Sequence, residues 1–466
     1  MSVTRLLAAN VLMLVAGLGL LPLLGVARTW RELVDRSGLS YLCGIVLAGI
    51  VSANLALVHV SVGWLALAVL AAGLGAVGAW RLRGTERPVW RRPRAVTVAG
   101  AAALSAVLAE YARAFVVAPL NRYDAWAIWA LKGHALYAFG WADPVVFAGS
   151  QYRFANLDYP LWLPSVEAID FRAMGTFDTR ILHLQFLLFL VAALGALAAL
   201  LRDRVPPVLM WCSLLAVVLA PAVFDQLLTA YADVPLALVF AIGATAAARW
   251  LVTGERWALA VATLCFGGAL LTKNEGSLFV VAAFLGLAVA ARHRLRPLAI
   301  AAAVDLALAV PWKIYVRVHD IHSINYSLTD SFDLDHLHGR FGIGPIAFRA
   351  LGRQLVDPLQ WGLLIPLFAL AVGAALVLGL RALPLYAAVL TLVSWLGLSW
   401  IYVISHFEYS AYLDSTKERV TASIVLAGAG LTPLLAAEAL RRARAGGSSR
   451  GPRRPLRRGE ARPAGR

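Results

Sequence analysis

The chain has 466 residues, of which 61% are hydrophobic and 15% are charged, and its mean hydropathy is +0.74. Soluble domains are about half apolar and a quarter charged, so this composition excludes an ordinary soluble protein. The formal net charge of +16 could suggest a nucleic-acid partner, but no reading motif accompanies the arginines. They are segregated by membrane topology instead, and nucleic acid is not an expected partner.

Apolar stretches of the length of a membrane helix follow one another along most of the chain. A helix that crosses a bilayer needs about 20 apolar residues. No cleavable signal peptide precedes a soluble domain, so the first stretch is interpreted as a membrane helix. The sequence predicts an all-α polytopic membrane protein of about 13 transmembrane helices. They fall near residues 6–27, 41–59, 63–80, 97–118, 180–201, 207–223, 233–251, 257–272, 276–291, 297–315, 359–380, 384–404 and 419–440.

Arginine-rich loops predict which face of the membrane is cytoplasmic. Residues 81–94 contain six arginines, and residues 441–466 contain ten with a single glutamate. Because arginine is enriched in cytoplasmic loops, an odd number of spans puts both segments in the cytoplasm of an inner (plasma) membrane protein. The tail 441–466 is nearly free of apolar residues, so it is predicted to be disordered and to lie on anionic membrane lipids.

The opposite face receives two long loops, residues 119–179 and 316–358, and a shorter one at 405–419. Loops that a rigid scaffold carries are where chemistry usually takes place. The sequence therefore predicts a functional site on the extracytoplasmic face.

The first long loop opens with NRYDAWAIWALKGHALYAFG, residues 121–140. Its aromatic residues recur at helical spacing, and tryptophan favours the headgroup level, so we predict a helix that lies in the membrane interface. Asp124 would stand at the start of this helix, directly after the fourth span. An aspartate there can cap the helix or can be functional, and the two roles do not exclude each other.

Two more acids belong to the same face. Asp158 lies in LDYPLWLP, residues 157–164, whose prolines hold the backbone extended. Asp233 lies in YADVPLAL, just before Pro235, where capping of the following helix is its default role.

Cations and a further acid complete the outer motifs. LTKNEG sets Lys273 and Glu275 in a tight turn, where a snorkelling lysine beside a helix-end acid is the simple alternative. STKERV places Lys417 and Arg419 at the entry to the last span. There a cation could meet a lipid phosphate or merely snorkel.

In this order, the motifs YDAWAIWALKGHAL, DYPLWLP, YADVPLAL, LTKNEG and STKERV resemble the GT-C superfamily of integral-membrane glycosyltransferases. The chain looks most like the bacterial branch related to protein O-mannosyltransferases and the lipid A aminoarabinose transferase. The resemblance covers residues 97–440, which leaves residues 1–96 as additional transmembrane helices and a basic cytoplasmic loop. Asp124 is followed by Ala125, where protein O-mannosyltransferases have an Asp-Glu pair, and this departure weakens the case for a protein acceptor.

The resemblance implies an inverting transferase that takes a sugar from a polyprenyl-phosphate carrier on the outer face. Its acceptor would be an envelope glycan, lipid or protein, and no cofactor is required. The implied catalytic residue is Asp124, and an aspartate with a reference pKa of about 3.9 is ionised and can accept the proton of an attacking hydroxyl. Cations must offset the charge of the leaving phosphate, and the candidates are Lys273, Lys417 and Arg419. Substrate-positioning roles are expected for Asp158, Asp233, Glu275 and Lys132.

The second long loop contains DSFDLDHLHGRFG, residues 330–342. It brings together side chains of metal-ligand type, and a His-x-His pair on an extended segment places both rings on one face. Solvated loop charges are the commoner outcome for such a segment, so a divalent metal is the minor alternative, and the resemblance does not require one. The candidate ligands are Asp333, Asp335, His336 and His338.

Two other functions compete with the enzyme. A transporter or flippase of lipid-linked sugars is supported by Glu110, Arg113 and Asp305, which fall inside predicted spans, because intramembrane charges often line translocation paths. Against it, the two halves of the chain show no convincing repeat and no paired broken helices. A catalytically inactive relative that binds polyprenyl phosphate is the third hypothesis, and such a protein need not retain Asp124.

Overall fold

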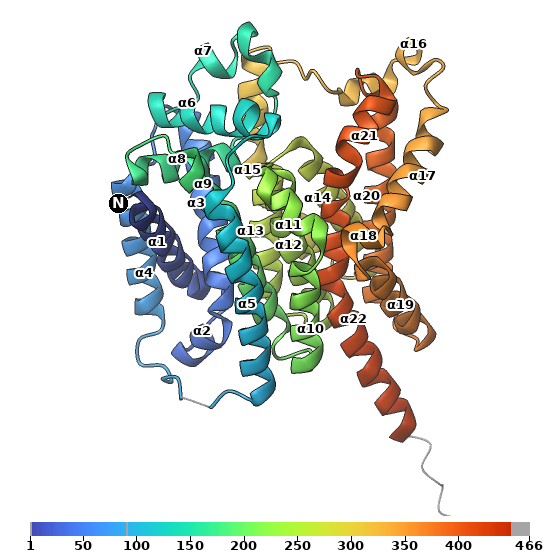
Figure 1. Cartoon of the computed structure of the whole chain (residues 1–466). Helices are drawn as coiled ribbons and strands as arrows, with labels where there is room; N and C mark the ends of the chain where they lie inside the picture. Colours follow the sequence, from blue (N-terminus) through green and yellow to red (C-terminus); the bar gives the residue numbers. More distant parts are fainter. Residues whose placement is uncertain (1, 90–91, 449–466) are drawn as a thin grey trace, which may run out of the picture.

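The computed structural model describes residues 2–89 and 92–448, and within them helices are the regular structure, with no β-strand. An isolated antiparallel bridge joins Tyr326 to Ser405. The long helices run side by side and cross the molecule from one end to the other (Figure 1). The prediction of an all-α polytopic membrane protein is confirmed.

Within the described residues, nine helices are long and apolar enough to cross a membrane. They are α1 (Ser2–Leu23), α3 (Gly38–Ala56), α4 (Trp64–Arg81), α5 (Ala95–Val117), α9 (Thr179–Leu201), α12 (Asp233–Thr253), α15 (Leu295–Val318), α20 (Ala382–Ile404) and the run of α21 (Tyr409–Val420) into α22 (Ala422–Ser448). The pair α10 (Pro207–Val218) and α11 (Pro221–Thr229), bent by 50°, makes a tenth span if it is counted as one. Three apolar helices are shorter: α13 (Arg256–Leu270), α14 (Asn274–Ala290) and α19 (Leu364–Val377).

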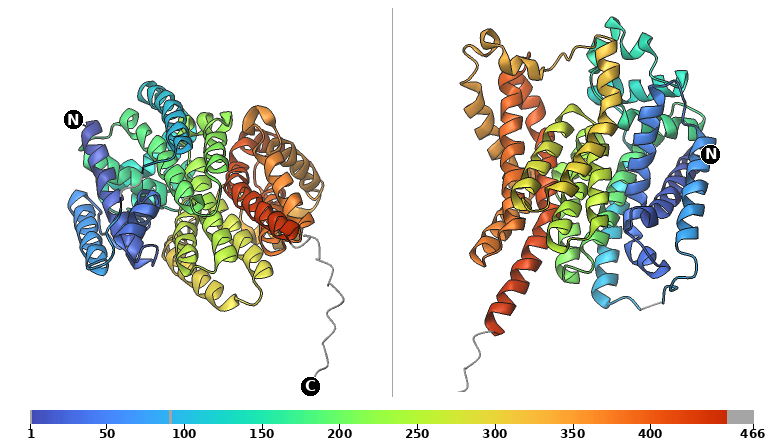
Figure 2. Two further views of the ribbon diagram at one scale, coloured as in Figure 1. Left: turned by 90° about the horizontal axis from the view of Figure 1, so that it is seen from below. Right: turned by 180° about the vertical axis from the view of Figure 1, so that it is seen from behind.

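The loops sort to the two ends of this bundle. The first long loop and the start of the second lie at one end, at the top of Figure 1 and again at the top of the rear view in Figure 2, and we call it the loop end. The first contains η1 (Ala125–Ala130), α6 (Leu131–Phe139), α7 (Pro144–Phe147), η2 (Ser150–Ala155) and α8 (Trp162–Met174). The second contains η3 (Leu328–Phe332), α16 (Leu334–Leu337), α17 (Ile343–Leu355) and α18 (Pro358–Trp361). The rest of the second loop, α17 and α18, runs down the side of the bundle from the loop end (Figure 1).

The opposite end carries α2 (Trp30–Arg36) and the loop from α4 to α5, and we call it the arginine end (Figure 1). The predicted separation of long loops from arginine-rich segments is therefore present. Which end faces the cytoplasm stays a prediction.

The first three spans belong to the same packed body as the rest of the bundle. α3 packs against α1, α8, α9 and α13. The backbones of α1 and α3 come so close that a Cβ atom at Gly44 would overlap the carbonyl oxygen of Met13. Small residues permit this kind of close approach between membrane helices. The described helices of the additional N-terminal part thus share one hydrophobic core with the helices of residues 97–440.

The C-terminal helix extends further than the sequence suggested. α22 continues through Ser448, so the prediction that disorder begins at residue 441 is wrong for residues 441–448, and residues 449–466 lie outside the described part of the chain. Arg441 forms an ion pair with Glu438 one turn earlier and donates a 2.7 Å hydrogen bond to the carbonyl of Arg204. These contacts, with the good helix propensity of alanine and arginine, carry the helix past the membrane boundary.

Candidate active site

Asp124 lies at the loop end, between the end of α5 and the start of η1. Its backbone is already helical, with φ −61° and ψ −31°, and its side chain caps no backbone N–H. Its Oδ2 atom instead accepts a hydrogen bond of 2.5 Å from Nη1 of Arg419. The interpretation of Asp124 as a helix cap is therefore wrong. Two residues from separate motifs form one ion pair, with side chains that are 27% and 18% exposed, respectively.

Arg419 keeps donors that Asp124 does not use. Its guanidinium lies over the ring of Tyr231, 4.7 Å from the ring centroid. A guanidinium has five N–H donors, and Nη1 is the group that bonds to Asp124. Burial raises the pKa of Tyr231, and the charge of Asp124 raises it further. The aromatic ring and the carboxylate thus fix the arginine from two sides.

A second cluster of charged side chains, more deeply buried than this pair, is formed by a lysine and two acids. Nζ of Lys273 is 2.8 Å from Oδ1 of Asp233 and 3.3 Å from Oε1 of Glu275, and all three side chains are buried. Burial alone would lower the pKa of Lys273, but the charges of Asp233 and Glu275 outweigh it and raise this pKa above its usual value. The side chain of Asp233 caps no helix, so its predicted capping role is also wrong. Lys273 is a buried, charged cation held by two carboxylates, and direct contact with a donor phosphate stays a prediction.

Asp158 and Lys132 lie deeper than predicted. Oδ2 of Asp158 accepts a 2.6 Å hydrogen bond from Asn274, while its Oδ1 is buried with no partner among the described residues. Lys132 is 0% exposed and donates to the carbonyl oxygens of Asn156, at 2.5 Å, and Tyr159, at 3.4 Å. Burial lowers the pKa of Lys132 to about 7, against the opposing charge of Asp158. Lys132 thus holds the segment between η2 and α8 to α6, and Asp158 joins the same segment to the start of α14. Their predicted contact with substrate stays untested.

The helix after Asp124 differs from the predicted one. η1 is a π-helix, and only from Leu131 does a regular α-helix follow. Trp126 is 52% exposed, but Trp129 is 1% exposed and stacks on Tyr159, with 5.6 Å between the ring centroids. The prediction that both tryptophans share an interfacial face is wrong for Trp129. In a π-helix the wider turn no longer brings residues three apart to the same side, and such turns are frequent at functional sites.

The remaining predicted side chains make local contacts. Lys417 pairs with Asp414 at 2.7 Å on α21. In the second loop, Asp333 accepts hydrogen bonds from the backbone N–H groups of Asp335 and His336, which is a helix cap. His338 lies at the end of the short helix α16. Within the described residues, no group of three or more histidine, cysteine or acidic side chains is placed to hold a metal ion, and metal dependence stays a prediction.

A polar cavity of about 670 Å³ lies beside the Asp124–Arg419 pair. Arg419 and Tyr231 line it together with Arg122, and further polar lining comes from Asn121, Asp225, Gln226, Ser415 and Glu418. Sequence reasoning missed Arg122 and Tyr231, although both stand inside the quoted motifs, because neither is an acid or an obvious membrane-boundary cation. The cavity brings two arginines and two acids, Asp225 and Glu418, to the loop end of the membrane helices, and Asp124 reaches it through its ion pair with Arg419.

An apolar groove of about 650 Å³ begins next to this cavity, between α5 and α11. It is lined by Val107, Tyr111, Ala114, Val117 and Phe224, with Glu110 and Arg113. Val117 adjoins Ala118 of the polar cavity, and Phe224 adjoins Asp225, so the two spaces follow each other along the same two helices. The polar cavity and the apolar groove are thus neighbours, with the groove on the side of the membrane helices α5 and α11.

Comparison with known proteins adds no relative. No protein-family model matches the chain, and no curated protein or solved structure is significantly similar to it.

The charges that favoured a transporter have two different surroundings. Glu110 and Arg113 pair with each other at 3.5 Å, and their side chains are 69% and 82% exposed, so they face out of the bundle. Asp305 is 2% exposed, and both of its carboxyl oxygens are buried without a partner among the described residues. The exposed pair borders the groove between α5 and α11 on the outside of the bundle and does not line a path through its interior. Asp305 is the feature that keeps the transporter hypothesis open.

Proposed function

We propose that the protein is an inverting glycosyltransferase of GT-C type that moves a sugar from a polyprenyl-phosphate carrier to an acceptor in the cell envelope. The observation that carries this proposal is the Asp124–Arg419 ion pair beside a polar cavity that has an apolar groove next to it. The loop end is then the extracytoplasmic face of the inner membrane. The acceptor is an envelope glycan, lipid or protein.

The donor has three parts that fit three parts of the site. Its prenyl chain would lie in the groove between α5 and α11, which opens among the membrane helices. Its phosphate would meet Arg419 and Arg122, because a guanidinium matches the geometry of phosphate oxygens better than an ammonium does. Its sugar would occupy the polar cavity, near Asp124.

The transfer follows from this placement. The hydroxyl oxygen of the acceptor forms a bond to the anomeric carbon as the bond from that carbon to the phosphate oxygen breaks. The electron pair leaves with the polyprenyl phosphate, and the hydroxyl proton passes to the carboxylate of Asp124. Attack from the side opposite the phosphate inverts the anomeric centre. Because Arg419 now holds Asp124, we infer that the incoming phosphate takes over the arginine and frees the carboxylate to act as the base.

Substitution of Asp124 tests the proposal. Purified protein in detergent is given a polyprenyl-phosphate sugar and an extract of acceptors, and release of free polyprenyl phosphate is measured. Asp124→Asn should lower turnover at least about 100-fold and leave donor binding nearly intact, because only the base is lost. Arg419→Gln should weaken binding of the sugar donor instead, because it removes the positive charge and the N–H groups that would bond to the donor's phosphate.

The matched control is Asp320→Asn. Asp320 is at the same end of the molecule with a side chain that is 89% exposed, and its left-handed backbone also suits asparagine. Wild-type turnover by Asp124→Asn would remove this residue from the reaction. Transport of the lipid-linked sugar with no release of polyprenyl phosphate would support a flippase instead.

A further inference from the structure

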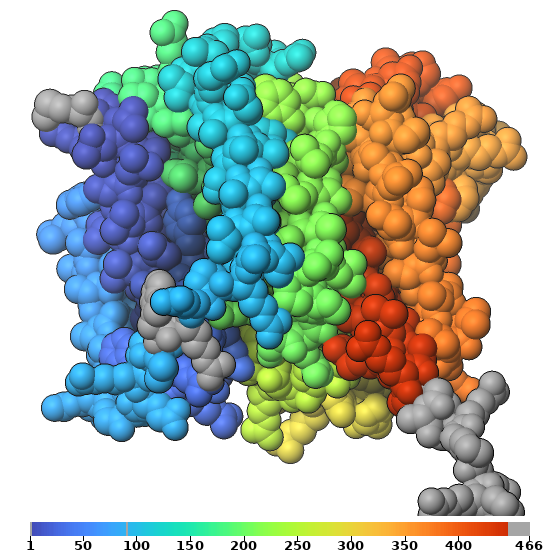
Figure 3. Space-filling view, turned by 60° about the horizontal axis from the view of Figure 1, so that its bottom comes forward, coloured from blue at the N-terminus to red at the C-terminus, as the bar shows by residue number. Residues whose placement is uncertain are grey.

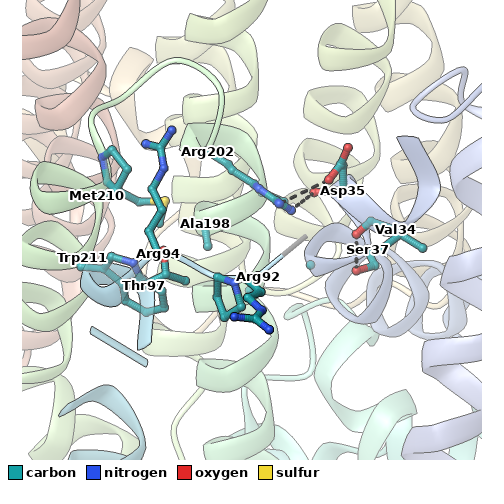
Figure 4. A pocket seen from close by; sticks show the side chains of 15 residues that line it. Val34, Asp35, Ser37, Arg92, Arg94, Thr97, Ala198, Arg202, Met210 and Trp211 are labelled. Atoms are coloured by element: carbon teal, nitrogen blue, oxygen red, sulfur yellow. Dashed lines mark hydrogen bonds and ion pairs between the residues drawn. The ribbon is translucent and has the colours of Figure 1, made fainter. Parts of the chain in front are cut away.

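A second cavity, of about 660 Å³, lies at the arginine end, away from the candidate active site. Four parts of the chain meet there: the junction of α2 and α3, the segment before α5, the end of α9 and the start of α10. Figure 3 turns this end of the molecule toward the reader, and Figure 4 shows the cavity from close by. In that view Ala198 lies near the centre, with Thr97 and Trp211 on one side and Val34 and Ser37 on the other.

The charge around this cavity is unbalanced. Three arginines line it, Arg92, Arg94 and Arg202, against a single acid, Asp35, which leaves an excess of two positive charges. Arg202 is already engaged, with Nη2 at 3.3 Å from Oδ1 of Asp35. Among the described residues, the guanidinium groups of Arg92 and Arg94 have neither an ion pair nor a hydrogen bond. Two arginines are therefore available to an anion.

Backbone groups add to the positive potential. The long helices α3 and α5 begin at this cavity, and neither has a side-chain cap at its N-terminus. The shorter helix α10 also begins here, but its first residue, Pro207, has no N–H to offer. The first N–H groups of a helix have no partner within the helix and favour an anion. The cavity thus combines free guanidinium groups with uncapped helix starts.

The floor of the cavity is apolar. Gly195, Ala198 and Ala199 of α9 present a face of small residues, and Met210 and Trp211 of α10 form the wall beside it. The ring of Trp211 packs directly on the backbone of α5, at Gly100. A free inorganic anion would contact the arginines but not the apolar floor. A lipid could contact both, with its charged headgroup on the arginines and its acyl chain on the floor.

We propose that this cavity binds an anionic glycerophospholipid of the membrane leaflet at the arginine end. Its phosphate would contact Arg92 and Arg94, and the start of an acyl chain would lie over the small residues of α9. The site lies at the ends of membrane helices, which is the depth of lipid headgroups, and basic pockets between membrane helices suit anionic headgroups. This proposal does not depend on the glycosyltransferase function.

Titration with defined lipids tests the site. The full-length protein in detergent is titrated with phosphatidylglycerol or with zwitterionic phosphatidylcholine, and bound lipid is counted by native mass spectrometry. Wild-type protein should bind phosphatidylglycerol in preference. The double variant Arg92→Gln/Arg94→Gln should bind it about 10- to 30-fold more weakly, because each basic residue near an anionic headgroup strengthens binding by about three- to fivefold.

A charge-matched control separates this site from general attraction to the basic end. Arg292→Gln/Arg296→Gln removes two exposed arginines at the same end, one from the turn between α14 and α15 and one from the first turn of α15, and should leave the affinity unchanged. Thr97→Trp fills the cavity from a partly exposed position without changing the charge, and it should also weaken phosphatidylglycerol binding.

Two results would overturn the proposal. One is an equal loss of phosphatidylglycerol binding in the control and in the Arg92/Arg94 variant, with Thr97→Trp like wild type. The other is that inorganic phosphate at millimolar concentration displaces phosphatidylglycerol completely, which would mean that the cavity recognises a free anion and not a lipid.

Discussion

At the scale of residues, partners decide what a charged side chain does. Asp124 and Asp233 each stand where an aspartate would cap a helix, and neither does so, because a cation from a distant motif takes the carboxylate. The sequence identified both acids and both cations, Lys273 and Arg419, but not which acid each cation meets. The pairing depends on how α12, α14 and α21 pack at the loop end, and no local pattern encodes it. Arg122 and Tyr231 escaped notice for the same reason.

The buried cation makes a prediction about stability at this scale. Lys273→Met leaves the buried carboxylates of Asp233 and Glu275 without their cation, and we expect the free energy of unfolding to fall by about 3–5 kcal/mol. Lys417→Met is the matched control. Its partner Asp414 is 72% exposed, so water replaces much of the lost ion pair and the change should stay within about 1 kcal/mol. Unfolding by a denaturing detergent in mixed micelles measures both, and equal losses would mean that Lys273 is not held as described.

At the scale of elements, hydrophobic runs predicted where helices lie but not how regular they are. All thirteen predicted segments contain a helix, because a run of apolar residues in a bilayer has few alternatives. The bend of 50° between α10 and α11 is explained by Pro221, the first residue of α11, which cannot continue the hydrogen bonds of α10 and is visible in the sequence. The π-helix η1 is not visible in the sequence, and neither is the stacking of its Trp129 on Tyr159, a residue from a segment 30 positions further along the chain.

Glycine at the contact of α1 and α3 makes a prediction for these elements. Gly44→Ala would push a methyl group into the carbonyl oxygen of Met13, so the helices must separate, at a cost of at least about 1 kcal/mol. Gly73→Ala in α4 has open space around the new methyl group and should be neutral or slightly stabilising. The thermal midpoints of the two purified variants give the comparison. A Gly44→Ala protein as stable as Gly73→Ala would show that the helices are not in backbone contact.

At the scale of the whole molecule, the two ends differ in the way the sequence predicted. The first long loop, which contains Asp124 and Asp158, lies at one end, and the arginine-rich segment between α4 and α5 lies at the other (Figure 1). This asymmetry could be predicted because charge distribution in loops follows simple rules of membrane insertion. The two cavities could not, since each is lined by residues from several helices that are far apart in the chain.

Labelling of intact cells tests the orientation. In a Cys212→Ser background, which removes the exposed native cysteine, one new cysteine is introduced as Asp320→Cys at the loop end or as Arg83→Cys at the arginine end. A membrane-impermeant maleimide should label the first in intact cells and the second only after lysis. Labelling of Arg83→Cys in intact cells would invert the orientation and place Asp124 in the cytoplasm, where the proposed outer-face transfer could not occur.

The position of Trp162 has a consequence for any attempt to trim the protein to a minimal enzyme. Its indole N–H donates to the carbonyl of Val46 at 3.2 Å, and its ring rests against Gly49 of α3. A shortened chain starting at residue 97 would lack α3, so the ring of Trp162 would lose its packing partner and its N–H would lose its acceptor. Trp162 follows closely on Asp158, so the position of this acid should be affected as well. The N-terminal helices therefore support the fold of the region after residue 97. Without them the shortened protein should aggregate on extraction from the membrane.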